Sequence, residues 1–434
     1  MNQTSIWQND MNFKAFQSLN KDIKTNVLII GGGIAGILTA YELESRGIEY
    51  VLVEKSKICS GVTKNTTAKI TSQHGLIYQK LFKNNDATMA RLYYEFNNNA
   101  ISKYEKLSRQ YDIDFEYKDN YVYSTNSKDK LYKEAKALSC TNIPYDFCEN
   151  IELPILTYGA IKFPNQAQFN PAKLLSRLSK NLNIYENTFV QRIEDNTAIT
   201  ENARIKADKI VIATHFPFIN KHGLYPLKMY QDRSYVIACK DAQKINGMYI
   251  DESGKGLSFR SYNDNLLIGG GSHRTGCEGS CWSKIEDFKD KHYPDAKVIY
   301  RWAAQDCMTL DNFAYIGKYS KSTPNMFVVT GFNKWGMTTA MSGAELIADL
   351  IEGKTNDYAE LFSPSRSMLK PQLFINSGYA VSNLLSFSPK RCTHLGCSLK
   401  WNKAEHSWDC ACHGSRYNEA GCVINNPAQN NLNI

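Results

Sequence analysis

Three glycines near the N-terminus have the spacing that holds the pyrophosphate of a dinucleotide. Gly31, Gly33 and Gly36 follow a fully apolar run at residues 27–30 and open a stretch whose apolar residues have helical spacing. In this context the first glycine permits a tight turn, and the second lets the phosphates approach the backbone. The third lets the helix pack closely on the strand. An ordinary strand–turn–helix with incidental glycines is the alternative interpretation.

Further residues are expected to complete this nucleotide site. Residues 49–54 read as the next strand, and Glu54 at its end would bind a ribose hydroxyl. The loop at residues 59–69 is rich in small and hydroxyl side chains that suit a pyrophosphate or a flavin edge, with a solvated loop as the alternative. The other binding candidates in the first half of the chain are Ile34, Ala35, Lys55, Thr63, Thr67, Ala68, Val190, Ala213 and Thr214.

Cysteine and histidine residues near the C-terminus form a second chemical pattern. Cys392-x-His394 is followed, after fifteen residues, by Cys410-x-x-His413. A zinc ribbon would need two CxxC pairs, whereas each segment here offers one thiolate and one imidazole. Two sulfurs can hold one iron and two nitrogens the other, so the segment resembles a Rieske [2Fe-2S] domain. A zinc site or unrelated cysteines are the alternative.

The Rieske resemblance implies a role for each matching residue. It implies a loop-tying disulfide between Cys397 and Cys412, which would be unusual in a cytosolic protein. It implies that the Ser415 and Tyr417 hydroxyls bond to sulfur and raise the cluster potential. Residues 426–428 resemble the proline loop that covers the cluster. The ligands that it implies are Cys392, His394, Cys410 and His413.

The elements that must position these groups are predicted from apolar runs. Residues 209–215 and 325–331 read as buried strands, and residues 337–352 as a helix that ends at Gly353. The N-terminus of this helix would face a flavin ring and stabilise negative charge on it. The binding candidates in this part are Gly317, Gly331, Trp335, Gly336 and Met337.

Between these units the sequence predicts a region built for substrate. Residues 86–110 form an amphipathic helix, and residues 225–300 are rich in short strands and turns. The glycines at 269–271 do not form a second nucleotide loop, because Arg274 takes the third glycine position; a bulge or turn is favoured. We therefore expect no separate nicotinamide site. Residues 1–24 are expected to lie as an arm over the domain.

Residues 25–355 resemble the D-amino-acid-oxidase-like superfamily of FAD oxidoreductases, on the glycine turn, Glu54, the 63–69 loop, Ala213-Thr214, residues 311–317 and the 331–336 turn. The resemblance implies a discontinuous α/β FAD-binding Rossmann-like domain with an inserted α+β substrate domain. The Rieske resemblance of the tail implies a small all-β domain. The predicted FAD-binding domain comprises residues 1–85, 155–220 and 310–360. The predicted substrate domain comprises 86–154 and 221–309, and the Rieske domain 361–434.

Many members of this superfamily oxidise a C–N bond by hydride transfer to the flavin. Members that bind a simple amino acid often clamp its carboxylate with an arginine, but Asp306 stands at that place here. Asp306 would receive a cationic amine or pair structurally with Arg301. Trp335 is the candidate wall beside the flavin, and His74 is a further catalytic candidate. Other side chains that would line the site are Arg260, His273 and Arg274.

Composition limits the remaining choices. The net charge of +8 is spread out, so no nucleic-acid partner is inferred, although an acidic redox partner would suit it. The longest apolar run contains three glycines and is too short to span a bilayer, and no signal pattern opens the chain. Five of the twelve cysteines lie between residues 392 and 422, and the others are scattered as reduced thiols would be. A cytoplasmic location is expected.

Together these patterns predict an FAD-dependent oxidoreductase with a Rieske centre. It would take a hydride from a small-molecule amine, amino-acid-derived or alcohol substrate to FAD. Electrons would then leave one at a time through the cluster to a one-electron redox partner protein. The alternatives are the reverse flow, in which the cluster feeds a flavin reductase, and a non-enzymatic redox sensor or electron-transfer protein.

Overall fold

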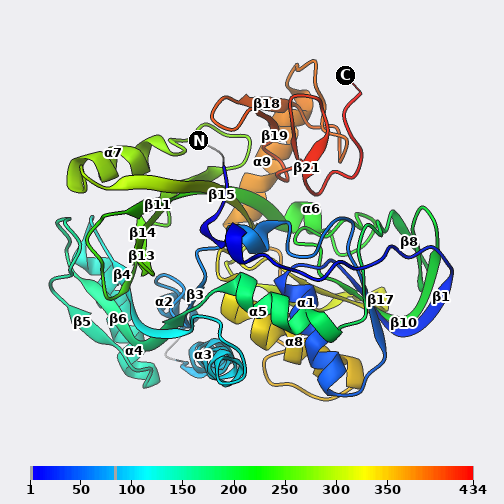
Figure 1. The fold of residues 1–434 in the computed structure, drawn as a ribbon, viewed down its shortest axis with the longest axis horizontal. Coiled ribbons are helices and arrows are strands. Elements are labelled where there is room, and N and C mark those ends of the chain that lie inside the picture. The colour runs from blue at the N-terminus through cyan, green and yellow to red at the C-terminus, as the bar shows by residue number, and fades with distance from the viewer. Residues whose placement is uncertain (1–2, 83–85, 434) are drawn as a thin grey trace.

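The computed structural model describes residues 3–82 and 86–433, which form three β-sheets with helices packed on them (Figure 1). The first sheet has the order β16-β17-β10-β1-β2-β7, parallel except for β16 at its edge. Its strands are β1 (Ile23–Ile30), β2 (Tyr50–Val53), β7 (Ile184–Tyr185), β10 (Arg204–Ile212), β16 (Tyr315–Ser320) and β17 (Thr323–Thr330), with β8 (Arg192–Glu194) and β9 (Thr197–Ile199) attached to β10.

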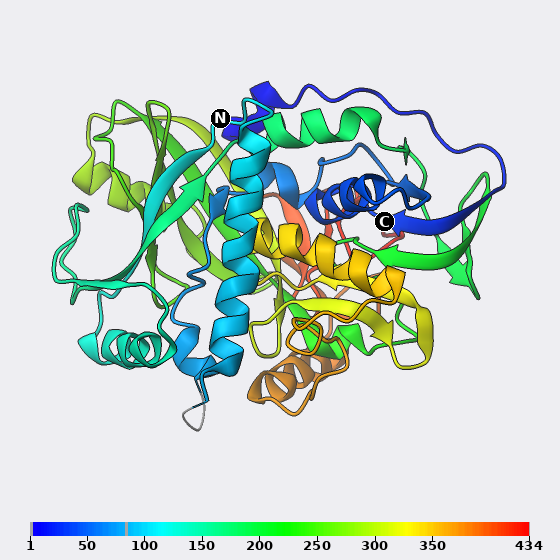
Figure 2. The same cartoon turned by 90° about the horizontal axis from the view of Figure 1, so that it is seen from below.

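Helices cover this sheet because its central strands are apolar on both faces. Helices α1 (Ile34–Ser45) and α8 (Gly336–Glu352) pack against each other on one side (Figure 2). The predicted strands and helices of this α/β unit are confirmed, including the end of α8 at Gly353, which has a left-handed backbone. The short helices α5 (Pro171–Leu178) and η3 (Ser179–Asn181) follow the return of the chain to this sheet.

The second sheet is mostly antiparallel, with the order β15-β11-β14-β13-β12-β4-β6-β3 and β5 paired to β6. The predicted bulge is present where β14 passes through its glycines, because the pairing register with β11 shifts there. Its strands are β3 (Lys69–Ile70), β4 (Glu116–Tyr123), β5 (Asp146–Cys148), β6 (Ala160–Gln168), β11 (Met229–Lys240), β12 (Met248–Asp251), β13 (Ser258–Tyr262), β14 (Asn265–Arg274) and β15 (Lys297–Thr309). The helices that lie between β3 and β15 along the chain and outside the first unit are α2 (Tyr78–Leu81), α3 (Thr88–Ser108), α4 (Lys128–Thr141), α6 (Tyr225–Lys228) and α7 (Ser283–His292), of which α3 packs on α8.

One part of the predicted domain division needs correction. Strands β3 and β6 pair with each other and β6 with β4, so they belong to the second sheet, although their residues were assigned to the FAD-binding domain. Hydrogen bonding between strands far apart in sequence decides this, and single-strand patterns do not reveal it. The other boundaries stay predictions.

The C-terminal part forms a small third sheet in the order β18-β19-β20-β21, as expected for an all-β module. Its strands are β18 (Leu399–Asn402), β19 (Ser407–Cys410), β20 (Arg416–Tyr417) and β21 (Val423–Asn425). Helix α9 (Pro371–Leu385) precedes it and lies at the edge of the molecule (Figure 2). Among the described helices, none combines the length and the apolar character that a membrane span requires.

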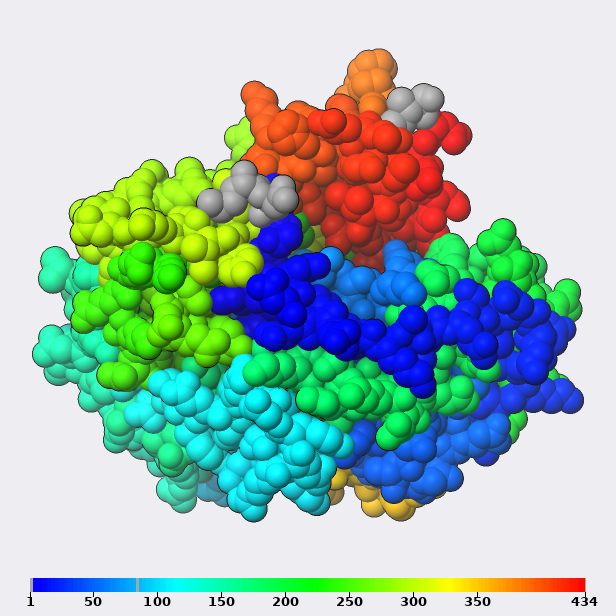
Figure 3. Space-filling view, viewed as in Figure 1, coloured from blue at the N-terminus to red at the C-terminus, as the bar shows by residue number. Residues whose placement is uncertain are grey.

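The N-terminal segment is the expected arm. From residue 3 onward it crosses the face of the molecule as an extended chain that begins with η1 (Ile6–Asp10), dark blue in Figure 3. Trp7 is fully buried, and its indole N–H donates to the Thr66 carbonyl at 2.7 Å, next to η2 (Val62–Asn65). The arm therefore holds the hydroxyl-rich loop in place from outside.

Candidate functional site

A cavity of about 1030 Å³ draws its walls from all three sheets. Gly33 lines it on the side of the first sheet and Asp306 of β15 on the side of the second. Residues 423–429 of the C-terminal module close a further side. The nucleotide signature, the second sheet and the cluster module therefore share one cavity.

The glycine turn is shaped so that side chains are excluded from it. Gly31 has a φ of +112°, and a Cβ there would lie 2.5 Å from the Ala213 carbonyl oxygen. A Cβ at Gly36 would lie 1.8 Å from the Gly31 oxygen, which confirms that this glycine lets α1 pack on β1. Thr63 Oγ1 accepts from the Ile34 N–H at 3.0 Å and so ties the hydroxyl-rich loop to the turn. These residues leave a cradle beside backbone N–H groups that fits a pyrophosphate.

Most predicted cofactor residues line this cavity, and three do not. Gly36 packs α1 on the sheet, as described. Ala68 instead offers its carbonyl to the buried Arg260 guanidinium at 2.8 Å, and Gly317 lies in β16 against Pro364. Those that line it are Gly31, Gly33, Ile34, Ala35, Glu54, Lys55, Thr63, Thr67, Val190, Ala213, Thr214, Gly331, Trp335, Gly336 and Met337.

Two carboxylates face each other at the substrate side. Asp306 on β15 is the direct cross-strand neighbour of Asp232 on β11, and both line the cavity. Burial raises the pKa of Asp306 to about 6. Lys334 Nζ lies 3.7 Å from Asp232 Oδ2. Arg301 pairs with Glu286 at 3.5 Å, which replaces the pairing with Asp306 considered from the sequence.

His74 and Trp335 form a stacked pair in the cavity wall. Their ring centroids lie 4.6 Å apart, with 12° between the planes. The His74 nitrogens are engaged, Nδ1 with the Tyr93 hydroxyl at 2.5 Å and Nε2 with the Thr71 carbonyl at 2.7 Å. Burial lowers the pKa of His74 to about 3, so the ring stays neutral. His74 is therefore suited to hold Trp335 in position, not to exchange protons.

The four predicted cluster residues converge at the edge of the third sheet. The His394 and His413 rings lie 4.9 Å apart, and the Nδ1 atom of each is buried without a hydrogen-bond partner among the described residues. Burial lowers their pKa values, to about 4 for His394 and about 3 for His413, so both are neutral as ligation requires. Cys392 and Cys410 supply buried thiols. This donor set fits a [2Fe-2S] cluster.

The hydroxyl predicted beside the cluster is in place. The Tyr417 hydroxyl lies 3.3 Å from Cys392 Sγ and accepts from the Thr393 N–H at 2.9 Å. The Ser415 hydroxyl accepts from the Ala428 N–H at 3.0 Å, which fixes the proline loop.

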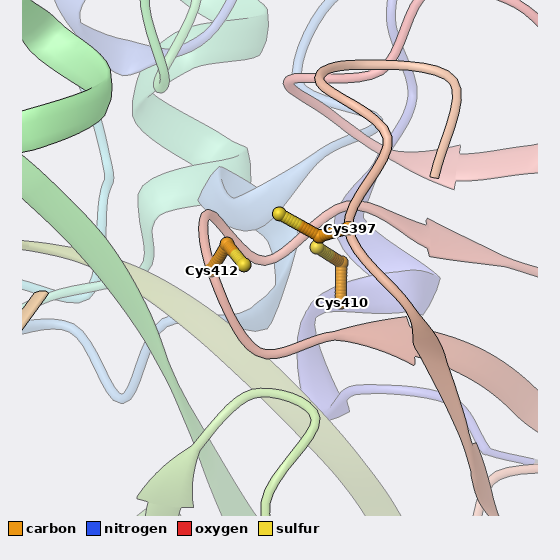
Figure 4. Close-up of side chains that lie close together, drawn as sticks. All are labelled: Cys397, Cys410 and Cys412. Carbon is orange, nitrogen blue, oxygen red and sulfur yellow. The ribbon is translucent and has the colours of Figure 1, made fainter. Parts of the chain in front are cut away.

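The expected disulfide is not formed. Cys397 and Cys412 are free thiols, and with Cys410 their sulfur atoms lie within 4.8 Å of one another (Figure 4). The Cys412 thiol instead donates to the Tyr379 carbonyl of α9 at 3.8 Å.

A short segment joins the cavity to the cluster residues. Thr214 and His215 line the cavity, and the next residue, Phe216, packs edge-on against both cluster histidines, with centroid distances of 6.3 Å to His394 and 6.1 Å to His413. The Asn426 amide donates to the Thr214 carbonyl at 2.5 Å. Sequence analysis found Thr214 but missed the contact of Phe216, because nothing local marks it.

The cluster module is fixed to the second sheet by buried polar groups that sequence analysis also missed. Gln231 donates to the His413 carbonyl at 2.7 Å, and the Arg233 guanidinium forms a two-point pair with Glu405. Arg274 donates to the Ala411 carbonyl at 2.7 Å, so it serves this interface and not the cavity. The alternation of Gln231, Arg233 and Tyr235 on the buried side of the first half of β11 was the available signal. Among the cavity-lining residues that the structure describes, neither Arg260 nor His273 appears.

Comparison with known sequences identifies both parts. Residues 26–350 match the model of the family DAO, described as FAD dependent oxidoreductase, and residues 380–434 match the Rieske [2Fe-2S] domain. The protein YhfW of Bacillus subtilis (strain 168), which carries the name Rieske 2Fe-2S iron-sulfur protein, is 34% identical over 98% of this chain and 96% of its own. The chloroplastic cytochrome b6-f complex iron-sulfur subunit of Arabidopsis thaliana is 60% identical over 37 residues, 8% of this chain and 16% of that protein.

Solved structures share the fold of the larger part. Glycine oxidase from Geobacillus kaustophilus superposes with a TM-score of 0.67 at 19% identity, covering 80% of this chain and 99% of that one. An L-amino acid deaminase from Proteus vulgaris gives 0.66 at 18% identity, covering 84% of this chain and 100% of that one.

Proposed function

Because the chain belongs to the DAO family of FAD dependent oxidoreductases and carries a C-terminal Rieske [2Fe-2S] domain, we propose that it is a dehydrogenase that oxidises an amine and delivers electrons singly to a partner. When bound, FAD supplies a hydride acceptor and the cluster a one-electron carrier. The observation that carries the proposal is segment 213–216, which lines the cavity and contacts both cluster histidines.

The facing carboxylates support a cationic substrate. Like charges directly opposite on paired strands repel each other, and Asp232 and Asp306 hold this position inside the cavity. A substrate ammonium between them would relieve that repulsion. An amine must lose its ammonium proton before it can release a hydride. Asp306, with a pKa of about 6, is suited to hold the cation and take this proton.

A free amino acid fits the cavity less well. No arginine stands among the described residues that line it, so the two-point carboxylate clamp of a guanidinium is missing there. The nearest cation to the acidic pair, Lys334, is already beside Asp232 and accompanied by the Ser272 hydroxyl at 3.1 Å. The site therefore favours an amine, or an amino-acid derivative whose carboxylate is blocked.

An anaerobic substrate screen tests this proposal. Amines, carboxylate-blocked amino acids, free amino acids and alcohols are added to the holoenzyme, and flavin bleaching is followed. We expect amines to bleach the flavin and Asp306→Asn to lower kcat/KM about 100-fold without changing flavin content. The rate of the unmodified enzyme should rise with pH through about 6, and the variant should lose this rise. Bleaching by alcohols alone would contradict the substrate class.

A matched control and a potential measurement complete the test. Asp264→Asn removes a surface carboxylate, 81% exposed, and should leave the kinetics unchanged. The direction of electron flow is tested by the two midpoint potentials. A cluster potential above that of the flavin supports the dehydrogenase, and a cluster clearly below the flavin would favour the reverse flow.

A further inference from the structure

Helix α9 is amphipathic, but its apolar side faces solvent and its polar side faces the protein. Its apolar side chains face outward: Phe374 is 70% exposed, Val381 56% and Leu385 81%. Together with Gly378 these residues recur at helical spacing and form one stripe. Just beyond the helix ends, Leu369 is 80% and Phe387 99% exposed. We name this surface the α9 apolar face, and it comprises Leu369, Phe374, Ile375, Val381, Leu384, Leu385 and Phe387.

The opposite side of α9 explains why the helix has this orientation. Asn376 and Asn383, seven residues apart, are both buried. The Asn376 amide oxygen accepts from the Arg274 guanidinium at 2.9 Å, and the Asn383 carbonyl accepts from the Ser398 N–H at 2.9 Å. The polar side is therefore fixed to the rest of the protein by specific hydrogen bonds. Turning the apolar face inward would break them.

The stretch of chain that carries this face is charged with one sign only. Residues 361–404 contain six lysines and arginines and no aspartate or glutamate. Of the six, Arg366 is paired with Asp311. Arg391 donates to carbonyls at the end of α9, including that of Ser386 at 2.7 Å, so its charge has no acidic partner there. Lys370 directly precedes α9, and Lys390 follows Phe387 by three residues. The remaining lysines of this stretch are Lys400 and Lys403.

We infer that the α9 apolar face docks on the surface of an anionic phospholipid bilayer. Exposed Phe and Leu side chains on one side of a helix, framed by Lys and Arg, are the features of helices that lie in the membrane interface. The basic residues next to both ends of α9 match anionic headgroups, which attract each nearby Lys or Arg. An isolated cluster of this apolar character, at the edge of the molecule in Figure 2, is otherwise a liability for solubility.

This docking would place the cluster loop beside the membrane. Asn383 and Arg391 tie the C-terminal end of α9 to the loop at residues 392–398, through Ser398 and the Gly396 carbonyl. Leu395, next to the cluster histidine His394, is itself 45% exposed. A surface-bound molecule would thus present this loop, and not the flavin cavity, toward an acceptor held in or on the bilayer.

Vesicle co-sedimentation of the full-length holoprotein tests the inference. The probes are phosphatidylcholine vesicles with and without about one third phosphatidylglycerol. We expect binding to the anionic vesicles, and weakening by 1 M salt, which shortens the screening length to about 3 Å. The double substitution Leu385→Glu and Phe387→Glu should lower the partition coefficient on the order of 100-fold, because it removes two apolar anchors and adds repulsive charges.

Leu156→Glu provides the matched control, since Leu156 is 96% exposed but lies far along the chain from α9. It should bind vesicles like the unmodified protein. Both variants should keep their flavin and iron absorbance, which shows that they are folded. Failure of the unmodified protein to bind anionic vesicles would overturn the inference. So would unchanged binding of the double variant, or a concentration-dependent dimer in solution that the double variant abolishes.

Discussion

The flavin end and the cluster end of this protein are built to hold their cofactors in opposite ways. The flavin cavity draws on separate stretches of the first sheet and depends on side chains that are missing, as at Gly31 and Gly36. The cluster end depends on side chains that are present, two from each of two short loops. The flavin end should fail when a side chain is added where none fits, whereas the cluster end should fail when one of its four ligands is removed. The two ends should therefore respond differently to single substitutions.

The largest effect is expected at a cluster ligand. Cys410→Ala should abolish the iron content while the flavin absorbance stays, because a thiolate ligand cannot be replaced by a methyl group. Iron analysis together with the visible spectrum measures this. Cys422→Ala, at an exposed cysteine outside the ligand set, should keep its iron. A fully iron-loaded Cys410→Ala protein would show that Cys410 is not a ligand of the cluster.

At the flavin side, a single added methyl group is expected to give the opposite result, loss of FAD without loss of iron. Gly36→Ala would place a Cβ 1.8 Å from the Gly31 oxygen, so α1 must move away from the sheet at a cost of roughly 3 kcal/mol or more. We expect protein that loses FAD but retains iron, as measured by both absorbance bands. Gly378→Ala, in α9 and outside the cavity, where a Cβ meets nothing within 4 Å, should behave like the unmodified protein. Equal FAD content in both variants would contradict this assignment.

The interface between the cluster module and the second sheet is expected to weaken at low pH. Burial alone would raise the pKa of Glu405, but Arg233 and Arg416 outweigh it and lower the pKa from 4.5 to about 2. The stabilisation is therefore complete above about pH 4.5 and is lost as pH falls toward 2. Glu405→Gln should cost on the order of 3 kcal/mol near neutral pH, since it leaves buried cations without their partner.

Thermal unfolding between pH 2.5 and 7 measures this effect. The Glu405→Gln protein should show less loss of stability on acidification than the unmodified protein. Glu419→Gln is the control, because Glu419 pairs with His406 at the surface, 66% exposed. An acid response that Glu405→Gln leaves unaltered would show that this ion pair does not stabilise the interface between the cluster module and the second sheet.

The smallest effect is expected at Tyr417. Its hydroxyl lies 3.3 Å from Cys392 Sγ, and a hydrogen bond to a ligand sulfur stabilises the reduced cluster. Tyr417→Phe should lower the cluster potential by about 40 mV, which corresponds to one hydrogen bond of about 1 kcal/mol. A redox titration measures it, with the flavin potential as internal control. A shift of the flavin potential alone would show that the Tyr417 hydroxyl acts on the flavin and not on the cluster.

Features of the fold and of the site that depend on residues close together in the sequence could be predicted from it. The apolar run before Gly31 predicted β1, and the spacing of Cys392, His394, Cys410 and His413 predicted the cluster site. Both signals depend on neighbours within a few positions or on two short loops. The role of His74 was not predictable, because its neutrality follows from burial beside Trp335, far along the chain.

Long-range contacts account for most of what sequence analysis missed. Gln231 and Arg233 contact residues of the cluster module more than 170 positions away, so no window of sequence contains both partners. The expected Cys397–Cys412 disulfide came from resemblance alone, and the two thiols remain free. The outward apolar side of α9 is periodic in the sequence, but periodicity does not say which side is buried.

The most direct test of the account is the kinetics of electron exchange between the two ends. Bound flavin is reduced by a light pulse with a sacrificial donor under anaerobic conditions, and the cluster absorbance is followed at several protein concentrations. Transfer within one chain, along segment 213–216, predicts first-order cluster reduction whose rate constant is independent of protein concentration. A cluster that stays oxidised beside reduced flavin, or a rate that scales with concentration, would contradict the account.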